Sequence, residues 1–154
     1  MINTGITILD DVLSQDECQK LIAVYKQSAD IYNWHGSRPA KLDTHNEFIR
    51  ACTDKITAHV SQEFEIDWCQ IVLWPKGSYQ PPHLDTASMN TVFTSVTYLN
   101  DLYDGGETCI IEVTDVKAKT GRTVYFDGMK YKHSVNTITK GTRFTLPIWY
   151  KRSV

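Results

Sequence analysis

The chain has 154 residues and a formal net charge of -2, with 42% hydrophobic and 22% charged residues. These values are ordinary for a globular protein of one domain, and they argue against disorder. The near-neutral charge gives no basic field for nucleic acid, and no apolar run approaches the ~20 residues that span a bilayer. With no signal-peptide pattern at the N-terminus, we expect a soluble, cytoplasmic protein with no nucleic-acid or membrane partner.

Two amphipathic helices are predicted in the first third of the chain. Capping boxes at 14–17 (Ser-Gln-Asp-Glu) and 44–47 (Thr-His-Asn-Glu) mark where they begin. The apolar positions that follow at helix spacing are Cys18, Leu21, Ile22 and Tyr25 in the first helix, and Phe48, Cys52, Ile56 and Val60 in the second. Because each helix has one apolar stripe and a polar back, both are expected to pack on another layer.

The segment 30–43 between these helices has aromatic and charged residues, Gly36 and Pro39, and little periodicity. It is predicted to be a loop or an irregular hairpin. The side chains that it offers to a substrate are Tyr32, Trp34, His35 and Arg38. The alternative is a solvated connection with one or two aromatic residues folded back, which is the commoner role of a loop.

From residue 66 onward, short β-type segments alternate with turn residues. The predicted strands are 66–74, 91–99, 107–113, 122–126, 133–138 and 142–151. Many short strands with few helices predict a mostly β (α+β) protein, built as an antiparallel sandwich or barrel. We expect one domain over 1–154, with helical support at about 14–63 and a β-barrel core at about 66–151.

The four cysteines form no Cys-x-x-Cys pair, so neither a zinc site nor a thioredoxin-type redox centre is indicated. They are Cys18, Cys52, Cys69 and Cys109. Each lies in a stretch of apolar periodicity, and we therefore expect reduced cysteines in the core.

The last predicted strand has one polar and one apolar face, because successive side chains of a strand alternate. The faces are Arg143, Thr145, Pro147 and Trp149 on one side, and Phe144, Leu146, Ile148 and Tyr150 on the other. We expect the helices to cover the apolar face and the polar face to line an interior that holds a polar ligand. Pro147 has no N–H for the ladder, which predicts a sheet edge or a bulge.

The hairpin before this strand relates His133 to Arg143. A three-residue loop over 139–141, with Gly141 in the left-handed conformation, would pair Thr137 with Arg143. In that register His133 and Arg143 point into the same interior, whereas a two-residue loop would place them on opposite faces. The position of the glycine favours the three-residue loop.

His83 and Asp85 are two ligand-type side chains on one face of an extended segment, but composition alone gives roughly 0.4 such pairs by chance. Together with His133 they supply two imidazoles and one carboxylate, the set that holds non-haem Fe(II) and leaves other positions open. Arg143 is a permanent cation, and the parallel N–H groups of its planar guanidinium match the two oxygens of a carboxylate ligand. The alternative for Arg143 is a structural ion pair with an acidic residue elsewhere in the chain.

Motifs between residues 68 and 150 place these residues in a known order. They are Pro82-His83-Leu84-Asp85, Tyr98-Leu99-Asn100, Gly105-Gly106-Glu107-Thr108, Gly121-Arg122, Val124-Tyr125-Phe126, His133-Ser134-Val135, Gly141-Thr142-Arg143 and Trp149-Tyr150. In this order and spacing the chain resembles the Fe(II)/2-oxoglutarate-dependent dioxygenases, and among them the prolyl 4-hydroxylase-like branch. The resemblance implies a double-stranded β-helix (a jelly-roll, cupin-like barrel) with two supporting N-terminal helices.

The resemblance also implies roles for individual residues. By position, His83, Asp85 and His133 would be the catalytic iron ligands, and Arg143 would bind the distal carboxylate of 2-oxoglutarate. Further cosubstrate contacts are expected from Tyr98, Thr145 and Tyr79. The alternative for Tyr98 and Thr145 is that they only line the interior of the barrel and do not bind the cosubstrate. Trp74 lies where some relatives have a tyrosine near the cosubstrate, and Trp34, Arg38 and Trp149 are expected to contact the substrate.

The implied reaction is hydroxylation of a peptidyl proline, with 4-hydroxylation favoured. It uses Fe(II), 2-oxoglutarate and O2, releases succinate and CO2, and takes ascorbate as the reductant of the family. One alternative is the same chemistry on a free amino acid or another substrate. Two others are a metal-binding cupin-like isomerase, which would need the three ligands but not Arg143, and a non-catalytic binding module. The expected partner is a peptide or protein that contains proline.

Overall fold

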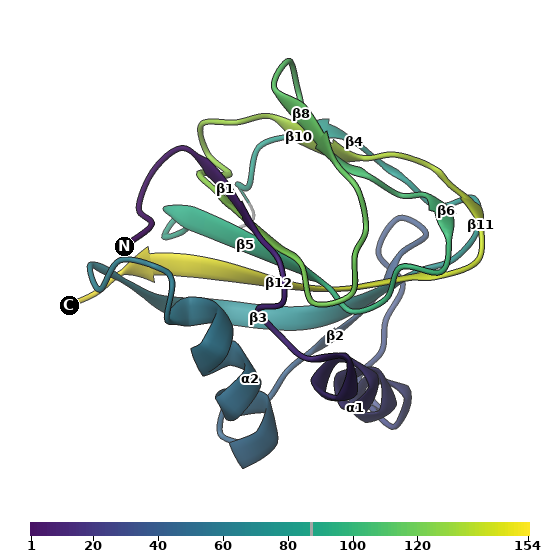
Figure 1. Cartoon of the computed structure of the whole chain (residues 1–154), viewed down its shortest axis with the longest axis horizontal. Helices are drawn as coiled ribbons and strands as arrows, with labels where there is room; N and C mark the ends of the chain where they lie inside the picture. Colours follow the sequence, from purple (N-terminus) through teal and green to yellow (C-terminus); the bar gives the residue numbers. More distant parts are fainter. Residues whose placement is uncertain (87) are drawn as a thin grey trace.

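The computed structural model describes residues 1–86 and 88–154. Two helices lie side by side beneath a broad sheet, and a second, smaller sheet lies above it (Figure 1). In chain order the elements are β1 (Ile6–Leu9), α1 (Gln15–Lys26), β2 (Arg38–Lys41), α2 (Glu47–Thr57), β3 (Phe64–Trp74), β4 (Gln80–His83), β5 (Phe93–Tyr98), β6 (Asp104–Gly105), β7 (Thr108–Ile110), β8 (Thr114–Val116), β9 (Thr123–Phe126), β10 (His133–Val135), β11 (Ile138–Lys140) and β12 (Arg143–Arg152).

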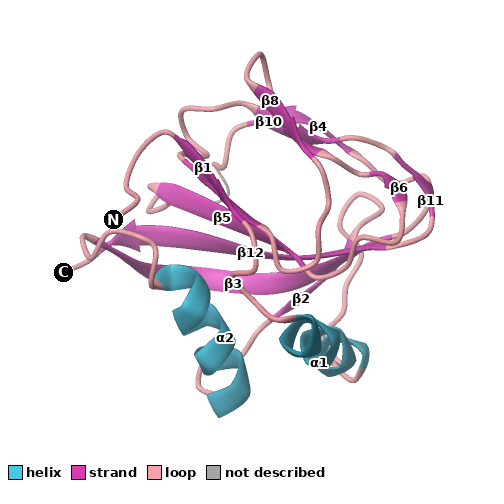
Figure 2. Ribbon diagram, in the orientation of Figure 1, coloured by secondary structure: helices cyan, strands magenta, loops and turns pink. Residues whose placement is uncertain are grey.

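The large sheet has six strands in the order β1-β9-β5-β12-β3-β2, and the small sheet has four in the order β4-β10-β7-β8. All pairings within them are antiparallel, and β11 pairs with β6 at one end of the interior. Figure 2 shows that the helices cover only the outer face of the large sheet, so its inner face is turned toward the small sheet. This arrangement confirms the predicted mostly β jelly-roll fold.

Helix α1 begins where the capping box predicts. The backbone N–H of Glu17 donates to Oγ of Ser14 at 3.1 Å, and the N–H of Ser14 donates to Oε1 of Glu17 at 2.9 Å. Helix α2 begins two residues later than expected, because Asn46 rather than Thr44 is its N-cap. Oδ1 of Asn46 accepts both the second and third free N–H groups of the helix, which Thr44 is too distant in sequence to reach.

The core lies between the helices and the large sheet. The apolar face of β12 packs there as predicted, with Phe144, Leu146, Ile148 and Tyr150 in one cluster with the buried residues of both helices. On α2, Cys52 and Ile56 are buried in that cluster as predicted, whereas Phe48 is only partly buried and Ile49 is buried beside it.

Three of the cysteines lie in this core, and all four are free. Burial raises the pKa of the Cys18 thiol to about 12 and that of Cys52 to about 11, so both are unreactive thiols at neutral pH. Cys109 is only partly buried, contrary to the expectation, because β7 belongs to the small sheet, which no helix covers.

The predicted hairpin register before the last strand is wrong. The segment 133–138 breaks into β10 and β11, and Ile138 pairs with Gly105 of β6 rather than with Thr142. Strand β12 instead pairs with β3 and β5 over long ladders that no two-strand hairpin could supply. His133 and Arg143 nevertheless line the same cavity, because their two sheets turn their inner faces toward each other.

Pro147 lies in a central strand, opposite Val96, and not at a sheet edge. Its partner lies in β5 alone: on the other side Thr145 pairs with Val72 and Ile148 with Cys69, and the pairing with β3 is interrupted at Pro147 between them. A register shift against β3 does occur two residues later, between Trp149 and Tyr150.

The segment 30–43 is an irregular hairpin that ends in strand β2. Trp34 and Ser37 exchange backbone hydrogen bonds of 2.8 and 3.0 Å across a turn in which His35 and Gly36 have φ of 50° and 92°. Strand β2 then joins the edge of the large sheet beside β3. Among the described residues, no helix is long and apolar enough to cross a membrane.

Candidate metal and cosubstrate site

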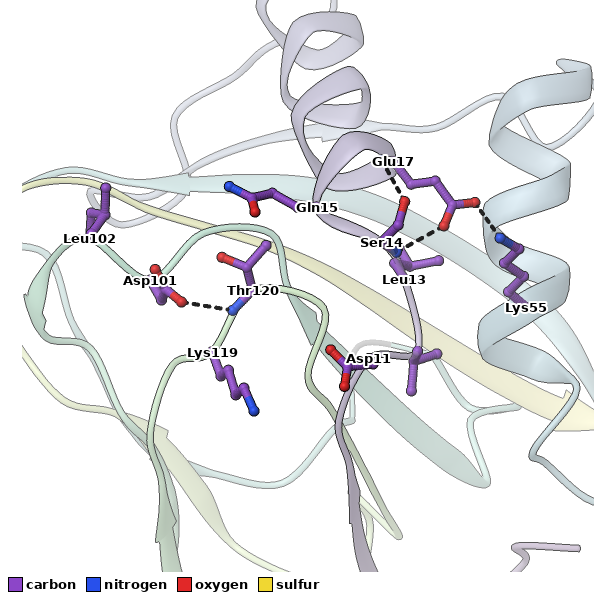
Figure 3. A pocket seen from close by; sticks show the side chains of 11 residues that line it. Asp11, Leu13, Ser14, Gln15, Glu17, Lys55, Asp101, Leu102, Lys119 and Thr120 are labelled. Carbon is purple, nitrogen blue, oxygen red and sulfur yellow. Dashed lines mark hydrogen bonds and ion pairs between the residues drawn. The ribbon is translucent and has the colours of Figure 1, made fainter.

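A surface cleft of about 720 Å³ lies beside the start of α1 (Figure 3). Both of its lysines are already paired, Lys55 with Glu17 at 2.7 Å and Lys119 with Asp10 at 3.3 Å, and Asp101 accepts the N–H of Thr120 at 3.1 Å. Ser14 and Glu17 are also committed to capping α1. The described residues of this cleft therefore present no convergent set of free polar groups.

The interior between the two sheets holds a second cavity, of about 600 Å³. Strands β3, β4, β5, β10 and β12 contribute its walls. Of the candidate site residues named from the sequence, those that line it are Tyr32, Trp34, Trp74, His83, Asp85, His133, Arg143, Thr145 and Trp149. The polar inner face of β12 is thus the wall of a cavity, as its alternation predicts.

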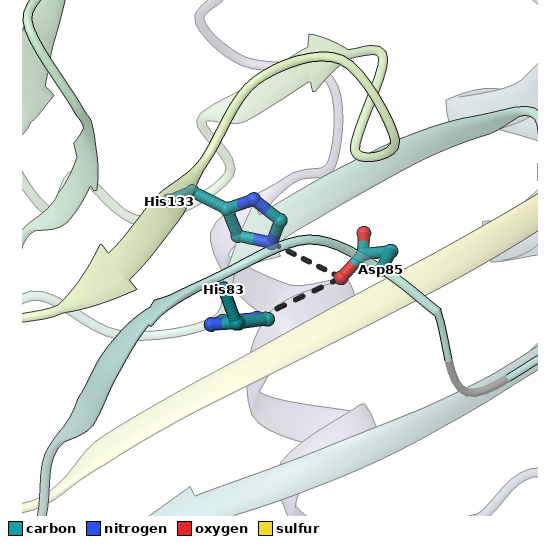
Figure 4. Close-up of side chains that lie close together, drawn as sticks. All are labelled: His83, Asp85 and His133. Carbon is teal, nitrogen blue, oxygen red and sulfur yellow. Dashed lines mark hydrogen bonds and ion pairs between the residues drawn. The ribbon is translucent and has the colours of Figure 1, made fainter.

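Antiparallel pairing brings the two histidines together across 50 residues of sequence. His83 ends β4, His133 begins β10, and the two residues are direct partners in the ladder. Asp85 follows two residues after His83, and its N–H donates to the carbonyl of Gly128 at 2.8 Å. One ligand atom from each of the three side chains lies within 4.8 Å of the others (Figure 4).

Backbone carbonyl groups fix which nitrogen of each imidazole carries the proton. Nδ1 of His83 lies 2.9 Å from the carbonyl oxygen of Pro81, and Nδ1 of His133 lies 2.9 Å from that of Tyr131. Because a carbonyl oxygen can only accept, Nδ1–H donates in both cases and Nε2 is directed at Asp85. Metal-binding histidines in proteins are oriented in this way.

The three inner atoms require a cation among them. Nε2 of His133 lies 3.1 Å from Oδ1 of Asp85, and Nε2 of His83 lies 3.7 Å from the same oxygen. Two nitrogen lone pairs and a carboxylate oxygen repel one another unless a proton or a metal ion lies between them. Two imidazoles and one carboxylate suit a divalent transition metal such as Fe(II), so the donor set fits the iron that the sequence predicts.

The local electrostatics keep these groups in the forms that bind metal. Burial, as the largest influence, lowers the pKa of His83, so its imidazole is neutral at neutral pH. Burial opposes ionisation of Asp85, but the neighbouring His133 and the hydrogen bond from Thr94 outweigh burial and lower its pKa. A neutral imidazole beside an ionised carboxylate is the protonation state that coordination requires.

Arg143 is a buried cation with no carboxylate partner among the described residues. The side chain is 2% exposed, and its partners are the carbonyl of Gly106 at 2.9 Å, Thr108 Oγ1 at 3.0 Å and Thr145 Oγ1 at 3.5 Å. The rings of Trp74 and Tyr98 lie against the guanidinium, 5.2 and 5.4 Å from their centroids. A buried charge held only by neutral groups is costly, and an anionic ligand in the cavity would compensate it.

The residues expected to assist Arg143 differ in their positions. The hydroxyl of Thr145 lines the cavity beside it. Tyr98 is not a lining residue, and its hydroxyl is already hydrogen-bonded: it donates to the carbonyl of Val116 at 2.9 Å and accepts the N–H of Thr108 at 3.1 Å. Tyr79 is 57% exposed and does not line the cavity.

Of the three residues expected to contact the substrate, two line the cavity and one does not. Trp149 lines the cavity and stacks on Trp68, with 4.0 Å between ring centroids. Trp34 lines the cavity on its exposed side and is 54% exposed. Arg38 is exposed and lies outside the cavity lining.

Two further residues of the site, Thr94 and Gly128, have no signal in the sequence that connects them to it. Thr94 donates to the second oxygen of Asp85, and Gly128 lies directly against that oxygen. Thr94 was recognisable only as an inward-facing residue, and Gly128 only as a turn residue. No local signal connects either residue to Asp85.

No protein-family model and no curated protein sequence matches the chain. Solved structures do match. The viral collagen prolyl hydroxylase vCPH from Paramecium Bursaria Chlorella virus-1, in its 2OG complex, has a TM-score of 0.81 and 20% identity, with 96% of each chain covered. HygX from Streptomyces hygroscopicus, with nickel and 2-oxoglutarate bound, has a TM-score of 0.78 and 13% identity, with 98% of this chain and 84% of that chain covered.

A third match is the prolyl hydroxylase from Trichoplax adhaerens in complex with a hypoxia inducible factor oxygen degradation domain peptide fragment. It has a TM-score of 0.75 and 17% identity, with 97% of this chain and 84% of that chain covered. These likenesses span nearly the whole chain and confirm the fold that the resemblance implies. The chain has the double-stranded β-helix fold of the 2-oxoglutarate- and Fe(II)-dependent oxygenases.

Proposed function

We propose that the protein is an Fe(II)- and 2-oxoglutarate-dependent dioxygenase that hydroxylates a residue within a peptide, with peptidyl proline as the first candidate. Succinate and CO2 are the accompanying products. The observation that carries this proposal is the presence of buried Arg143 in the same cavity as His83, Asp85 and His133. The requirement for ascorbate as reductant, and the choice of the 4-position, rest on the family resemblance alone.

Each part of the cavity has a separate task in this proposal. His83, Asp85 and His133 would hold the iron, and Arg143 with Thr145 would bind the distal carboxylate of 2-oxoglutarate. Iron with its cosubstrate supplies the oxygen activation that hydroxylation of a C–H bond requires. The protein positions the cosubstrate, keeps both imidazoles in one tautomer, and excludes water behind buried apolar walls such as Val72 and Val135.

Arg143 also separates this proposal from a cupin-like isomerase. Such an enzyme would need the three ligands but no buried cation beside them. An unpaired Arg143 in the interior would then destabilise the protein without contributing to the binding of a ligand. The same argument opposes a non-catalytic module that has only retained the fold.

The charges of the cavity favour a residue in a peptide over a free amino acid. Among the described lining residues, the only acidic or basic residues besides the two histidines are Asp85 and Arg143, and the proposed metal and cosubstrate occupy both. A free amino acid would bring an ammonium and a carboxylate that find no partners. The rest of the lining is uncharged and includes several aromatic rings, among them Tyr32, Trp34 and the stacked Trp68–Trp149 pair. Aromatic faces of this kind suit an uncharged ring such as that of proline.

The direct test is to incubate the protein with Fe(II), 2-oxoglutarate, dioxygen and a proline-rich peptide. Succinate formation and a mass gain of one oxygen on the peptide are followed together, with and without 2-oxoglutarate. Succinate that forms without a modified peptide would keep the oxygenase chemistry and redirect the search to another substrate. No 2-oxoglutarate binding and no succinate with any substrate would favour the isomerase or binding-module alternatives.

Replacing Trp34 by alanine is expected to raise the Michaelis constant for the peptide and to increase succinate formation that is uncoupled from hydroxylation. The reason is that Trp34 lines the exposed side of the cavity, where a closing hairpin would shield the reaction from water. Arg38→Ala in the same hairpin tests the second expected contact, and its exposed position outside the lining predicts a smaller change. Equal peptide kinetics in wild type, both single variants and the double variant would place substrate binding elsewhere.

A further inference from the structure

The two carboxylate oxygens of Asp85 have different surroundings. Oδ1 faces Nε2 of His133 and of His83, at 3.1 and 3.7 Å. Oδ2 faces away from both histidines toward Thr94, whose Oγ1 donates a hydrogen bond of 2.7 Å. Asp85 is 8% exposed and Thr94 is 2% exposed, so water does not compete for this bond.

Gly128 closes the space around Oδ2. Its carbonyl oxygen accepts the N–H of Asp85 at 2.8 Å, and a Cβ placed on Gly128 would overlap Oδ2 and lie 2.7 Å from Oγ1 of Thr94. Gly128 is not among the glycines with positive φ, so glycine is needed here for space and not for backbone conformation. Asp127 fixes this turn, because its Oδ1 accepts the N–H groups of Met129 and Lys130 at 2.9 and 3.1 Å.

We propose that Thr94 and Gly128 are positioning residues that make Asp85 a metal ligand through Oδ1 alone. The inference rests on the proposed function, since it concerns the same metal site. A six-coordinate ion held by three protein atoms keeps three positions for other ligands. If Oδ2 also coordinated, one of those positions would be lost, and a chelating α-keto acid together with dioxygen would no longer fit.

The test uses Co(II) as a spectroscopic substitute for Fe(II) in the full-length protein. Thr94→Val removes the hydroxyl and preserves the size of the side chain, whereas Thr94→Ser preserves the hydroxyl. We expect Thr94→Val to change the visible absorption of bound Co(II) and to weaken 2-oxoglutarate binding at saturating Co(II) by about tenfold or more. Thr94→Ser is expected to retain the wild-type spectrum and affinity.

Thr97→Val is the matched control on the same strand. Thr97 is also fully buried and shares a 2.7 Å hydrogen bond with Thr123, but it lies on the opposite face of β5 from Thr94. This variant loses a buried hydroxyl without approaching the metal, so its Co(II) spectrum should match that of the wild type. Gly128→Ala is expected to lower Co(II) affinity about 10- to 100-fold, because the added methyl group displaces the carboxylate.

The outcomes separate the inference from the proposed function. A wild-type spectrum and an unchanged 2-oxoglutarate affinity in Thr94→Val would overturn the inference alone. Equal changes in Thr94→Val and Thr97→Val would also overturn it, since they would reflect a general loss of packing. A wild-type protein that binds no Co(II) would overturn both the inference and the proposed function.

Discussion

His133→Ala and His83→Ala are each expected to lower the rate of succinate formation by more than about 100-fold, because loss of a residue that only supports a ligand already costs about 10- to 100-fold. Both variants should also bind less metal, which metal analysis of the purified proteins measures. His133→Ala should be the less stable of the two. Its ring packs against Phe126 with 4.8 Å between centroids and is 8% exposed, whereas the His83 side chain is 27% exposed.

His45→Ala is the control for the two ligand variants. His45 is exposed in the turn before α2 and is remote from the cavity lining, so its loss should leave turnover and metal content unchanged. Turnover at the wild-type rate with normal metal content in both ligand variants would show that these histidines do not hold the metal.

Replacement of Arg143 is expected to weaken 2-oxoglutarate binding at least about tenfold for each hydrogen bond lost, because bonds to charged groups contribute about 1.5–3 kcal/mol. Arg143→Ala removes the side chain, and Arg143→Met keeps most of its volume without charge. Metal affinity should change little, since Arg143 is not one of the three residues whose ligand atoms converge. Titration of 2-oxoglutarate into metal-loaded protein measures the effect.

Stability provides an independent test of the same residue. Because Arg143 is buried with only neutral partners, Arg143→Met should leave the free energy of unfolding unchanged or raise it in the absence of cosubstrate. Arg122→Met is the control, since Arg122 pairs with Asp10 at 2.7 Å at the protein surface and should not affect cosubstrate binding. Unchanged 2-oxoglutarate affinity together with lower stability in Arg143→Met would make Arg143 a structural residue.

Features that depend on near neighbours in the chain were predictable from the sequence. The Ser14 capping box joins residues three positions apart, and the two faces of β12 follow from alternation along a single strand. The start of α2 was misplaced because two residues that favour N-caps, Thr44 and Asn46, lie close together in sequence. Only the local backbone decides which of the two caps the helix.

Strand partners could not be predicted in the same way. Periodicity shows which side chains share a face of one strand but does not identify the neighbouring strand. The sequence therefore predicts a short hairpin before β12, whereas in the structure β12 forms long ladders with β3 and β5. Short strands such as β4, with two consecutive prolines, and β1 gave too little pattern to be recognised.

The sequence by itself determined the composition of the candidate site: two histidines, one aspartate and an arginine on inward-facing positions, in an order that resembles a known family. Only the tertiary structure decided that β10 pairs with β4 so that His133 meets His83, that Arg143 has no carboxylate partner among the described residues, and that Thr94 and Gly128 enclose one oxygen of Asp85. The reason is physical. Side-chain chemistry and alternation are properties of a few adjacent residues, whereas distances across the cavity depend on how two sheets pack after the chain has closed long loops.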